Sequence, residues 1–202
     1  MRTPPRPLVS RREFIQVSAG VAAVAATVPL SALAGAPDIL PLHKVVYDER
    51  FGPCRLFANE AKSCGADVHA IRGEVHDLWY DDLYYRWKSS PVAIAGMTTY
   101  VPMFRLAILA RDARMRVIYR AHHEMENATQ GGGHEVFGPH VALTRQSALR
   151  GPDTEWSRGA ARIVTSWPSR ALSVKGSESN IALADQSAIN GDTLLTWLIS
   201  TV

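Results

Sequence analysis

Cysteine is scarce in this 202-residue chain, and Cys54 and Cys64 are its only two. Both fall in one expected helix, ten residues apart, so they lie about 15 Å apart along its axis at 1.5 Å per residue. That separation is far beyond the reach of a disulfide bond. A fold that does without disulfides suits a protein that folds in the reducing cytoplasm.

Excess charge of one sign is also missing once the N-terminal segment is set aside. The chain has 22 Lys and Arg residues against 19 Asp and Glu, but four of the arginines and one glutamate lie in the first 34 residues. The remainder carries 18 of each and has no net charge. The pI of about 9.0 therefore belongs to the N-terminal segment, and a basic nucleic-acid-binding surface is not indicated.

Glycine-rich phosphate loops are missing as well. The first strand-like run is followed by DERFGPCR, which has one glycine and two acidic residues where a pyrophosphate would need several glycines. The sequence also lacks a P-loop, a Gly-x-Ser-x-Gly elbow, a Cys-x-x-Cys pair and a haem-attachment motif. Binding of NAD, FAD or ATP through the first loop is therefore not expected, and the cofactor, if the protein has one, stays unknown.

The N-terminal segment has the parts of a secretory signal. A basic end is followed by an uncharged run over residues 17–36, and Ala32-Leu33-Ala34 has the small-x-small pattern that signal peptidase cuts. Small residues and Pro29 make this run a poor permanent membrane anchor, and no second run is long enough to span a membrane. We expect a cleaved signal over 1–34 and a single domain over 35–202.

Ser10-Arg11-Arg12-Glu13-Phe14-Ile15 resembles the twin-arginine (Tat) export pattern, in which two arginines are followed by any residue, a Phe and an aliphatic residue. Gln16 stands where a Lys is often found. The resemblance covers the first 34 residues and implies a route, through the Tat translocon to the periplasm, with Arg11, Arg12 and Phe14 as signal residues. It also implies export in the folded state, either with a cofactor inserted or bound to a partner that carries one.

Between residues 44 and 119, short apolar runs typical of strands alternate with segments whose apolar residues recur at the 3.6-residue period of a helix. Strands are expected at 44–48, 66–72, 91–96 and 116–119, and helices at 53–64, 74–88 and 98–114. Strand-helix units repeated in this way predict a mainly parallel sheet with right-handed crossovers. We therefore expect a three-layer, Rossmann-like or flavodoxin-like α/β fold.

The last third of the chain is less regular. Residues 121–140 are polar and glycine-rich, which is typical of a long loop, and further helices are expected over 142–149 and from 153 to 167. Asn190-Gly191 lies between the apolar runs 181–189 and 193–200. This pattern predicts a C-terminal hairpin that adds an antiparallel edge to the sheet.

The carboxyl ends of parallel strands meet at one edge, where open α/β sheets bind ligands. The candidate ligand-binding residues at that edge are Asp48, Arg72, Gly96, Thr98 and Thr99. The last three would offer backbone N–H groups, hydroxyls and the positive end of a helix dipole to a carboxylate or phosphate. The same three residues are also typical of a capped helix after a tight turn, and the sequence leaves both interpretations open.

The candidate catalytic residues are His122, His123 and Cys54. Cys54 begins a helix, where the dipole lowers a thiol pKa, but it shares a helical face with Phe57 and Ala61, which favours a buried core thiol. His122, His123 and His134 are also weak candidates for a zinc, copper or iron site, without a known ligand spacing. No metal is favoured over solvated loop histidines, and adjacent residues of a strand would point to opposite faces.

Two functions remain open. The first is an exported accessory or small-ligand-binding protein, a partner of a Tat-exported oxidoreductase, for which Tyr80 and Tyr84 on one helical face provide a docking surface. The alternative is a small periplasmic enzyme, metal-dependent or not, that acts on an anionic small molecule at the strand edge. In the enzyme, His122 or His123 is the acid or base and Cys54 the nucleophile.

Overall fold

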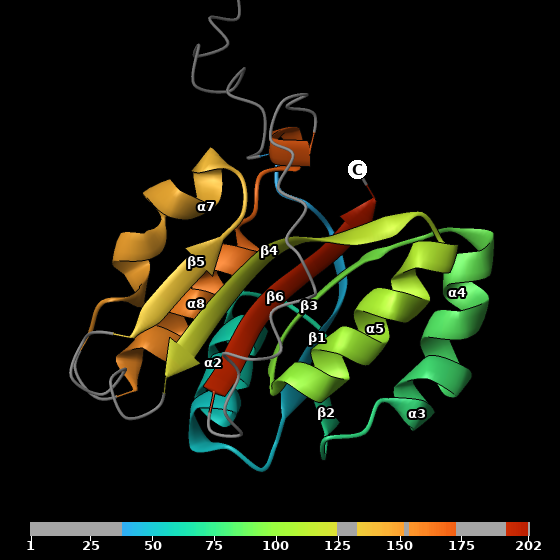
Figure 1. Cartoon of the computed structure of the whole chain (residues 1–202), viewed down its shortest axis with the longest axis horizontal. Helices are drawn as coiled ribbons and strands as arrows, with labels where there is room; N and C mark the ends of the chain where they lie inside the picture. The colour runs from blue at the N-terminus through green and yellow to red at the C-terminus, as the bar shows by residue number, and fades with distance from the viewer. Residues whose placement is uncertain (1–37, 125–132, 152–153, 173–192, 202) are drawn as a thin grey trace, which may run out of the picture. The chain divides into compact units, whose positions relative to one another are not determined.

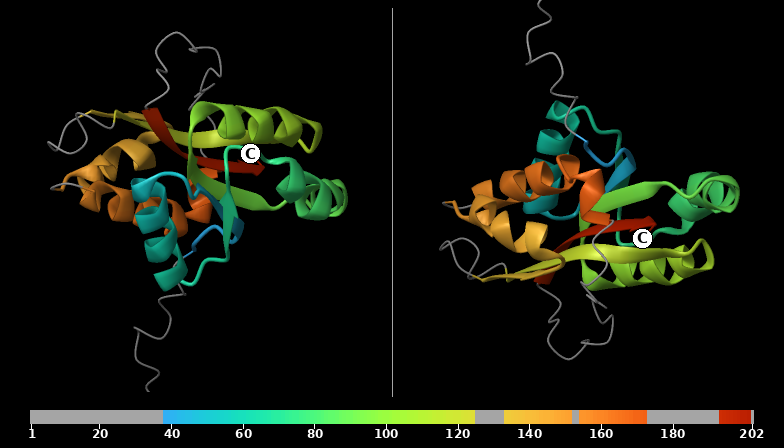
Figure 2. Two further views of the ribbon diagram at one scale, coloured as in Figure 1. Left: turned by 90° about the horizontal axis from the view of Figure 1, so that it is seen from below. Right: turned by 90° about the horizontal axis from the view of Figure 1, so that it is seen from above.

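The computed structural model describes residues 38–124, 133–151, 154–172 and 193–201, which form an α/β fold around one mixed sheet (Figure 1). Six strands lie in the order β2-β1-β3-β6-β4-β5. Their bounds are β1 Leu42–Asp48, β2 Val68–Ile71, β3 Ala93–Thr98, β4 Met115–Glu124, β5 His134–Phe137 and β6 Thr193–Thr201. Helices cover both faces of the sheet, as the two side views in Figure 2 show.

The first three strands confirm the parallel part of the sequence prediction. β1 pairs in parallel with β2 on one side and with β3 on the other. α2 (Gly52–Ser63) links β1 to β2 and ends before Gly65, whose φ of +87° is the left-handed conformation that favours glycine after a helix. α5 (Tyr100–Asp112) links β3 to β4. The alternating periods of the sequence therefore identified these elements correctly.

The segment between β2 and β3 is helical, as predicted, but it is not one regular helix. It contains α3 (His76–Leu78), a π-helical turn η2 (Trp79–Leu83) and α4 (Tyr84–Ser89). Leu78, Leu83 and Trp87 are buried against the sheet. Their spacing of five and four residues needs one wider turn to keep all three on one face, and π turns of this kind are frequent at functional sites.

The C-terminal strand corrects the prediction of an antiparallel edge. β6 is antiparallel, but it lies between β3 and β4 in the middle of the sheet (Figure 1). All its residues from Thr193 to Ser200 are buried, because central strands are covered on both faces. Three of the five strand pairings are therefore antiparallel. The other half of the expected hairpin, 181–189, lies outside the described residues.

The long loop predicted over 121–140 is also corrected in part. β4 continues to Glu124, and β5 pairs with it antiparallel through Ala121↔Val136 and His123↔His134. A register irregularity lies between Val117 and Tyr119 in the β4–β6 pairing. An extra residue at such a bulge changes which face the following side chains occupy. Tyr119 and Ala121 consequently pack on the opposite face from Val117.

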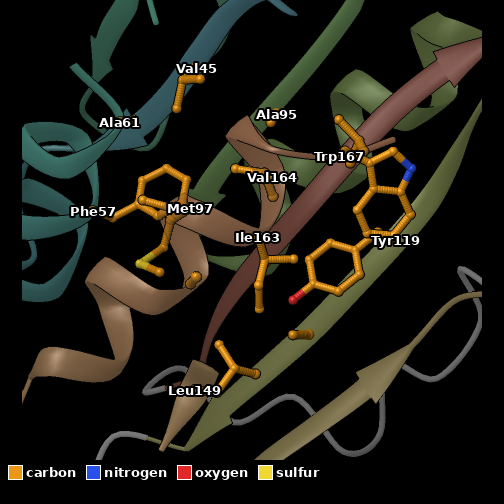
Figure 3. Close-up of a cluster of buried hydrophobic side chains, with 14 of the residues drawn as sticks. Val45, Phe57, Ala61, Ala95, Met97, Tyr119, Leu149, Ile163, Val164 and Trp167 are labelled. Atoms are coloured by element: carbon orange, nitrogen blue, oxygen red, sulfur yellow. The ribbon is translucent and has the colours of Figure 1, made fainter. Parts of the chain in front are cut away.

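Two apolar clusters hold the sheet between its helices. One packs β1, β3, β4 and β6 against α2 and α8 (Glu155–Thr165), and Figure 3 shows Phe57 beside Met97 and Tyr119 beside Trp167 in it. α7 (His140–Thr144) and the 3₁₀ turns η3 (Gln146–Leu149) and η4 (Ser169–Leu172) complete this side. The other cluster packs the opposite face against α5 and the α3–α4 segment. Across the described residues, no helix combines the length and apolar character needed to span a membrane.

Candidate functional sites at the strand edge and beside α5

The carboxyl ends of β1, β2, β3 and β4 share one edge of the sheet, as predicted, because β6 runs antiparallel to both β3 and β4. The chain moves from β1 out to β2 and then back past β1 to β3, so the strand order reverses between β1 and β3. Ligands of open α/β sheets bind at such a reversal. β6 separates β4 from β3 by two strand spacings, about 10 Å. The histidines at the end of β4 are therefore set apart from Thr98.

Asp48, at the end of β1, is fully buried and held by its own loop. Arg50 donates from Nε to one carboxylate oxygen at 2.8 Å and from Nη2 to the other at 2.6 Å. Its backbone N–H also reaches the carboxylate, at 3.2 Å. Gly73 leaves room for this guanidinium, because a Cβ there would lie 2.5 Å from Arg50 Nη2. The Arg50 guanidinium thus neutralises the Asp48 carboxylate and fixes the loop after β1. Arg72, just after β2, is exposed, and its Nε lies 3.2 Å from Glu49 Oε1.

Gly96 and Thr98 face the protein rather than a ligand. A Cβ on Gly96 would lie 2.4 Å from Trp197 Cζ2 and 2.5 Å from the carbonyl oxygen of Val46, so glycine here allows close packing. The Thr98 hydroxyl is buried, accepts from Trp197 Nε1 at 3.0 Å and donates to the Thr99 carbonyl at 2.8 Å. Thr99 precedes α5 without a side-chain cap bond. The interpretation of this turn as a threonine cap is therefore wrong, and the Thr98 hydroxyl bonds to the protein, whereas ligand binding by this turn stays a prediction.

Cys54 is buried among the apolar side chains of α2 and the sheet. Burial raises its thiol pKa, and the nearby charge of Asp48 raises it further. The pKa therefore moves in the direction opposite to the one that the helix dipole alone predicts. The interpretation as a core thiol is the one that the structure supports. Cys64, at the other end of α2, is exposed, and both cysteines are free.

His123 and His134 are brought together by the β4–β5 pairing. Their Nδ1 atoms lie 2.9 Å apart, and His123 Nε2 lies 2.8 Å from the Thr196 hydroxyl. The ring of Trp156 packs against both imidazoles, with centroids 4.4 Å and 5.3 Å away. Sequence reasoning missed Thr196 and Trp156, because they come from β6 and α8, far away in the chain.

Both of these histidines are neutral near pH 7. Burial, and then the neighbouring histidines, hold the pKa of His123 well below 6.5, and burial lowers the pKa of His134. A bond between two Nδ1 atoms requires one to donate and the other to accept. The Thr196–His123–His134 chain can therefore carry a proton between its ends by exchanging tautomers.

His122 points to the other face of β4, where its ring packs against Phe137 at 5.0 Å between centroids. The predicted divergence of His122 and His123 is thus confirmed, whereas their description as solvated loop residues is wrong, because both are buried in β4. Within the described ranges, no group of three or more His, Cys, Asp or Glu side chains has the arrangement of a metal site.

A groove runs between α5 and the α3–α4 segment and contains two adjoining cavities. Cavity A, of about 410 Å³, is lined by the apolar residues Trp79, Tyr84, Trp87, Pro91, Leu109 and Ala113. Its charged residues are Lys88, Asp112 and Arg114. Cavity B, of about 380 Å³, lies on the other side of Trp79 and Leu109 and includes Tyr80, Ile108 and the Arg105–Glu74 ion pair. Together they form what we call the α5 groove.

Several exposed apolar side chains lie on the elements that form the α5 groove. Tyr80, Tyr85, Val101 and Ile108 are exposed by 55%, 70%, 49% and 44%, and all four belong to the α3–α4 segment or to α5. Trp79 is in edge contact with both Tyr84 and Trp87. The sequence indicated the aromatic half of this surface through Tyr80 and Tyr84. It gave no indication of Leu109 or Arg114, because those come from the neighbouring helix.

No family model matches the chain, and neither a curated protein nor a solved structure matches it. What the protein does is therefore inferred from its own side chains and cavities.

Proposed function

We propose that this chain is an exported binding protein that holds a small molecule in the α5 groove. The observation that carries the proposal is cavity A, whose volume of about 410 Å³ and aromatic lining are typical of small-ligand sites. At the strand edge, by contrast, Asp48 and Thr98 already bond to the protein. Neither cavity A nor cavity B is lined by the residues predicted at that edge.

Native mass spectrometry of the exported protein, purified without denaturation, tests this proposal. We expect an additional mass that is lost on unfolding. In Leu109→Trp a larger side chain occupies space where the two cavities adjoin, so the variant should not bind the ligand and its spectrum should lack the additional mass. Leu143→Trp is the matched control, because Leu143 is 50% exposed on α7, outside both cavities. The proposal fails if Leu109→Trp keeps the ligand or if the folded protein carries none.

The export route is part of the same proposal. Arg11, Arg12 and Phe14 support delivery by the Tat translocon to the periplasm and removal of residues 1–34. Changing both arginines to lysine keeps the charge and removes the twin-arginine pattern. We expect the variant precursor to accumulate in the cytoplasm, measured by cell fractionation. Unchanged delivery to the periplasm would contradict the Tat route.

The same proposal includes an accessory role, in which the protein binds a co-exported oxidoreductase. The exposed Tyr80, Tyr85, Val101 and Ile108 support it, because apolar surface of this kind marks docking sites. We expect a stoichiometric complex with a larger, cofactor-carrying subunit after export. Tyr85→Lys should dissociate it, with Leu143→Lys as the control. A protein that stays monomeric in the native exported fraction would contradict this role.

An enzyme acting on an anionic molecule is the second candidate function. The Thr196–His123–His134 chain favours an enzyme, since this chain is a buried path that ends at a neutral, half-buried imidazole suited to acid–base chemistry. Turnover that survives His134→Gln and His123→Gln would exclude these histidines as the acid or base.

We also propose a flavodoxin-like relationship, because β2-β1-β3-β4 keep the flavodoxin order once the inserted β6 is set aside.

A further inference from the structure

The charged residues of cavity A differ in how they are paired. The Lys88 ammonium donates to the Tyr84 hydroxyl at 2.5 Å and lies 4.1 Å from the centre of its ring. In the part of the chain that the structure describes, the side chains of Asp112 and Arg114 have neither a hydrogen bond nor an ion pair. Arg114 is therefore the cation that cavity A leaves available to a ligand.

The backbone at Arg114 is unusual for an arginine. α5 ends at Asp112 and Ala113, and Arg114 follows with a φ of +56°, the only positive φ among the described residues that are not glycine. Its N–H bonds to the Arg111 carbonyl at 2.9 Å, which closes the helix as a glycine at this position normally does. A glycine would adopt this φ at a lower free-energy cost. Within the described residues, the Arg114 side chain makes no hydrogen bond or ion pair that would offset that cost.

The geometry points to cavity A as a binding site for a flat, aromatic carboxylate, with the Arg114 guanidinium holding the carboxylate and the Trp79, Tyr84 and Trp87 side chains contacting the ring. This inference rests on the proposed binding function and adds the chemical class of the ligand. Guanidinium groups bind carboxylates through two parallel hydrogen bonds, and aromatic rings pack favourably against flat apolar molecules. Lys88 contributes a second positive charge, and Asp112 opposes it with one negative charge.

Three compounds of one shape test the inference: 2-naphthoate, its neutral analogue 2-naphthamide and its cationic analogue 2-naphthamidine. Isothermal titration calorimetry is performed on the exported, processed protein at pH 7.5 in low salt. We expect naphthoate to bind about tenfold more tightly than naphthamide, the ratio typical of one charge-assisted interaction, and naphthamidine to bind most weakly.

Variants of the two unpaired charges should act in opposite directions. Arg114→Gly and Arg114→Asn, both of which tolerate a positive φ, should reduce naphthoate affinity to that of naphthamide. Asp112→Asn should increase naphthoate affinity by about threefold, because it removes a repulsive charge. Arg111→Gln is the matched control, since Arg111 is an exposed arginine in the last turn of α5 that lines neither cavity.

The outcomes separate this inference from the proposed function. If the three compounds bind equally and Leu109→Trp abolishes all binding, the groove is a binding site and the assignment of a carboxylate is wrong. If naphthoate affinity is unchanged in both Arg114 variants, Arg114 is not the anchor and the inference is also overturned. If none of the three compounds binds, the inference fails, and a ligand retained in the native mass spectrum would leave the proposed function standing.

Discussion

At the carboxyl edge of the sheet Asp48 and Thr98 bond to the protein itself, whereas two charged side chains of the α5 groove, Asp112 and Arg114, have no such bond within the described residues. Asp48 is fully buried and bonded to Arg50, and Thr98 is fully buried and bonded to Trp197. In the groove, Asp112 and Arg114 line cavity A without a pairing partner among the described side chains. The sequence directs attention to the first region, while the structure favours the second.

The difference shows that the position of a residue in a fold does not determine whether it can bind a ligand. A buried polar group costs free energy unless it is hydrogen-bonded, so most such groups are bonded inside the protein. Asp48 and Thr98 follow this rule, and their substitution should lower stability. Residues that line the α5 groove should instead affect binding, with little cost in stability.

Gly96→Ala should have the largest effect. Its Cβ would meet Trp197 and the Val46 backbone at 2.4 and 2.5 Å, and neither can move without disturbing the centre of the sheet. We expect the free energy of unfolding to fall by about 3 kcal/mol, the upper range for overpacking, as measured by urea denaturation. Gly52→Ala is the control, because its nearest neighbour would be the Arg55 side chain at 3.8 Å. Equal effects of the two variants would contradict a packing role for Gly96.

Asp48→Asn should have the next largest effect. The neutral amide cannot accept both guanidinium bonds from Arg50 or balance its charge. We expect a loss of about 2 kcal/mol, below the range for fully buried pairs because Arg50 is 45% exposed. The same variant should bind 2-naphthoate normally. A loss of binding without a loss of stability would return Asp48 to the ligand site.

Acid should destabilise the fold through three histidines, the buried His123 and the half-buried His134 and His69. Burial lowers the pKa of His123, His134 and His69 below 6.5, so the unfolded chain takes up protons before the folded one does. Stability is therefore full above about pH 7.5 and falls as the pH drops below 6.5, by up to about 1.4 kcal/mol per pH unit for each such histidine. Urea denaturation between pH 8 and pH 5 measures this slope.

His123→Gln should reduce the slope of that pH dependence. Glutamine does not titrate in this range, so one of the three contributions disappears. His76→Gln is the control, because His76 is exposed at cavity B. An unchanged slope in His123→Gln would mean that His123 does not remain neutral in the folded protein.

Local periodicity predicted the first half of the fold well and its later part less well. The elements from β1 to α5 have strong apolar patterns, and all were predicted except the π turn η2, which interrupts the helix expected over 74–88. β5 and the end of β4 were missed because His122, His123 and His134 resemble a polar loop, although Trp156 and Phe137 bury them. A signal for the position of β6 was present, since its sequence TLLTWLIST has no charged residue, which is typical of a central strand rather than an edge.

The candidate site was predictable only in part, for a related reason. The sequence correctly placed the polar residues that follow the parallel strands at one edge. It could not show that Trp197 bonds to Thr98, because this contact joins residues 99 apart in the chain. The α5 groove likewise combines Trp79 from the π turn with Leu109 from α5. Such pairings depend on tertiary packing.

Arg114→Gly should have the smallest effect on stability and the opposite sign. Glycine adopts a φ of +56° without the steric cost that a side chain carries, so we expect a gain of about 0.5–1 kcal/mol in urea denaturation. Arg114→Ala keeps a Cβ and should leave stability nearly unchanged, which separates the backbone effect from the loss of charge. A more stable protein that binds naphthoate less well would show that Arg114 serves the groove and not the fold. A loss of stability in Arg114→Gly would instead place Arg114 with Asp48, among the side chains that hold the structure together.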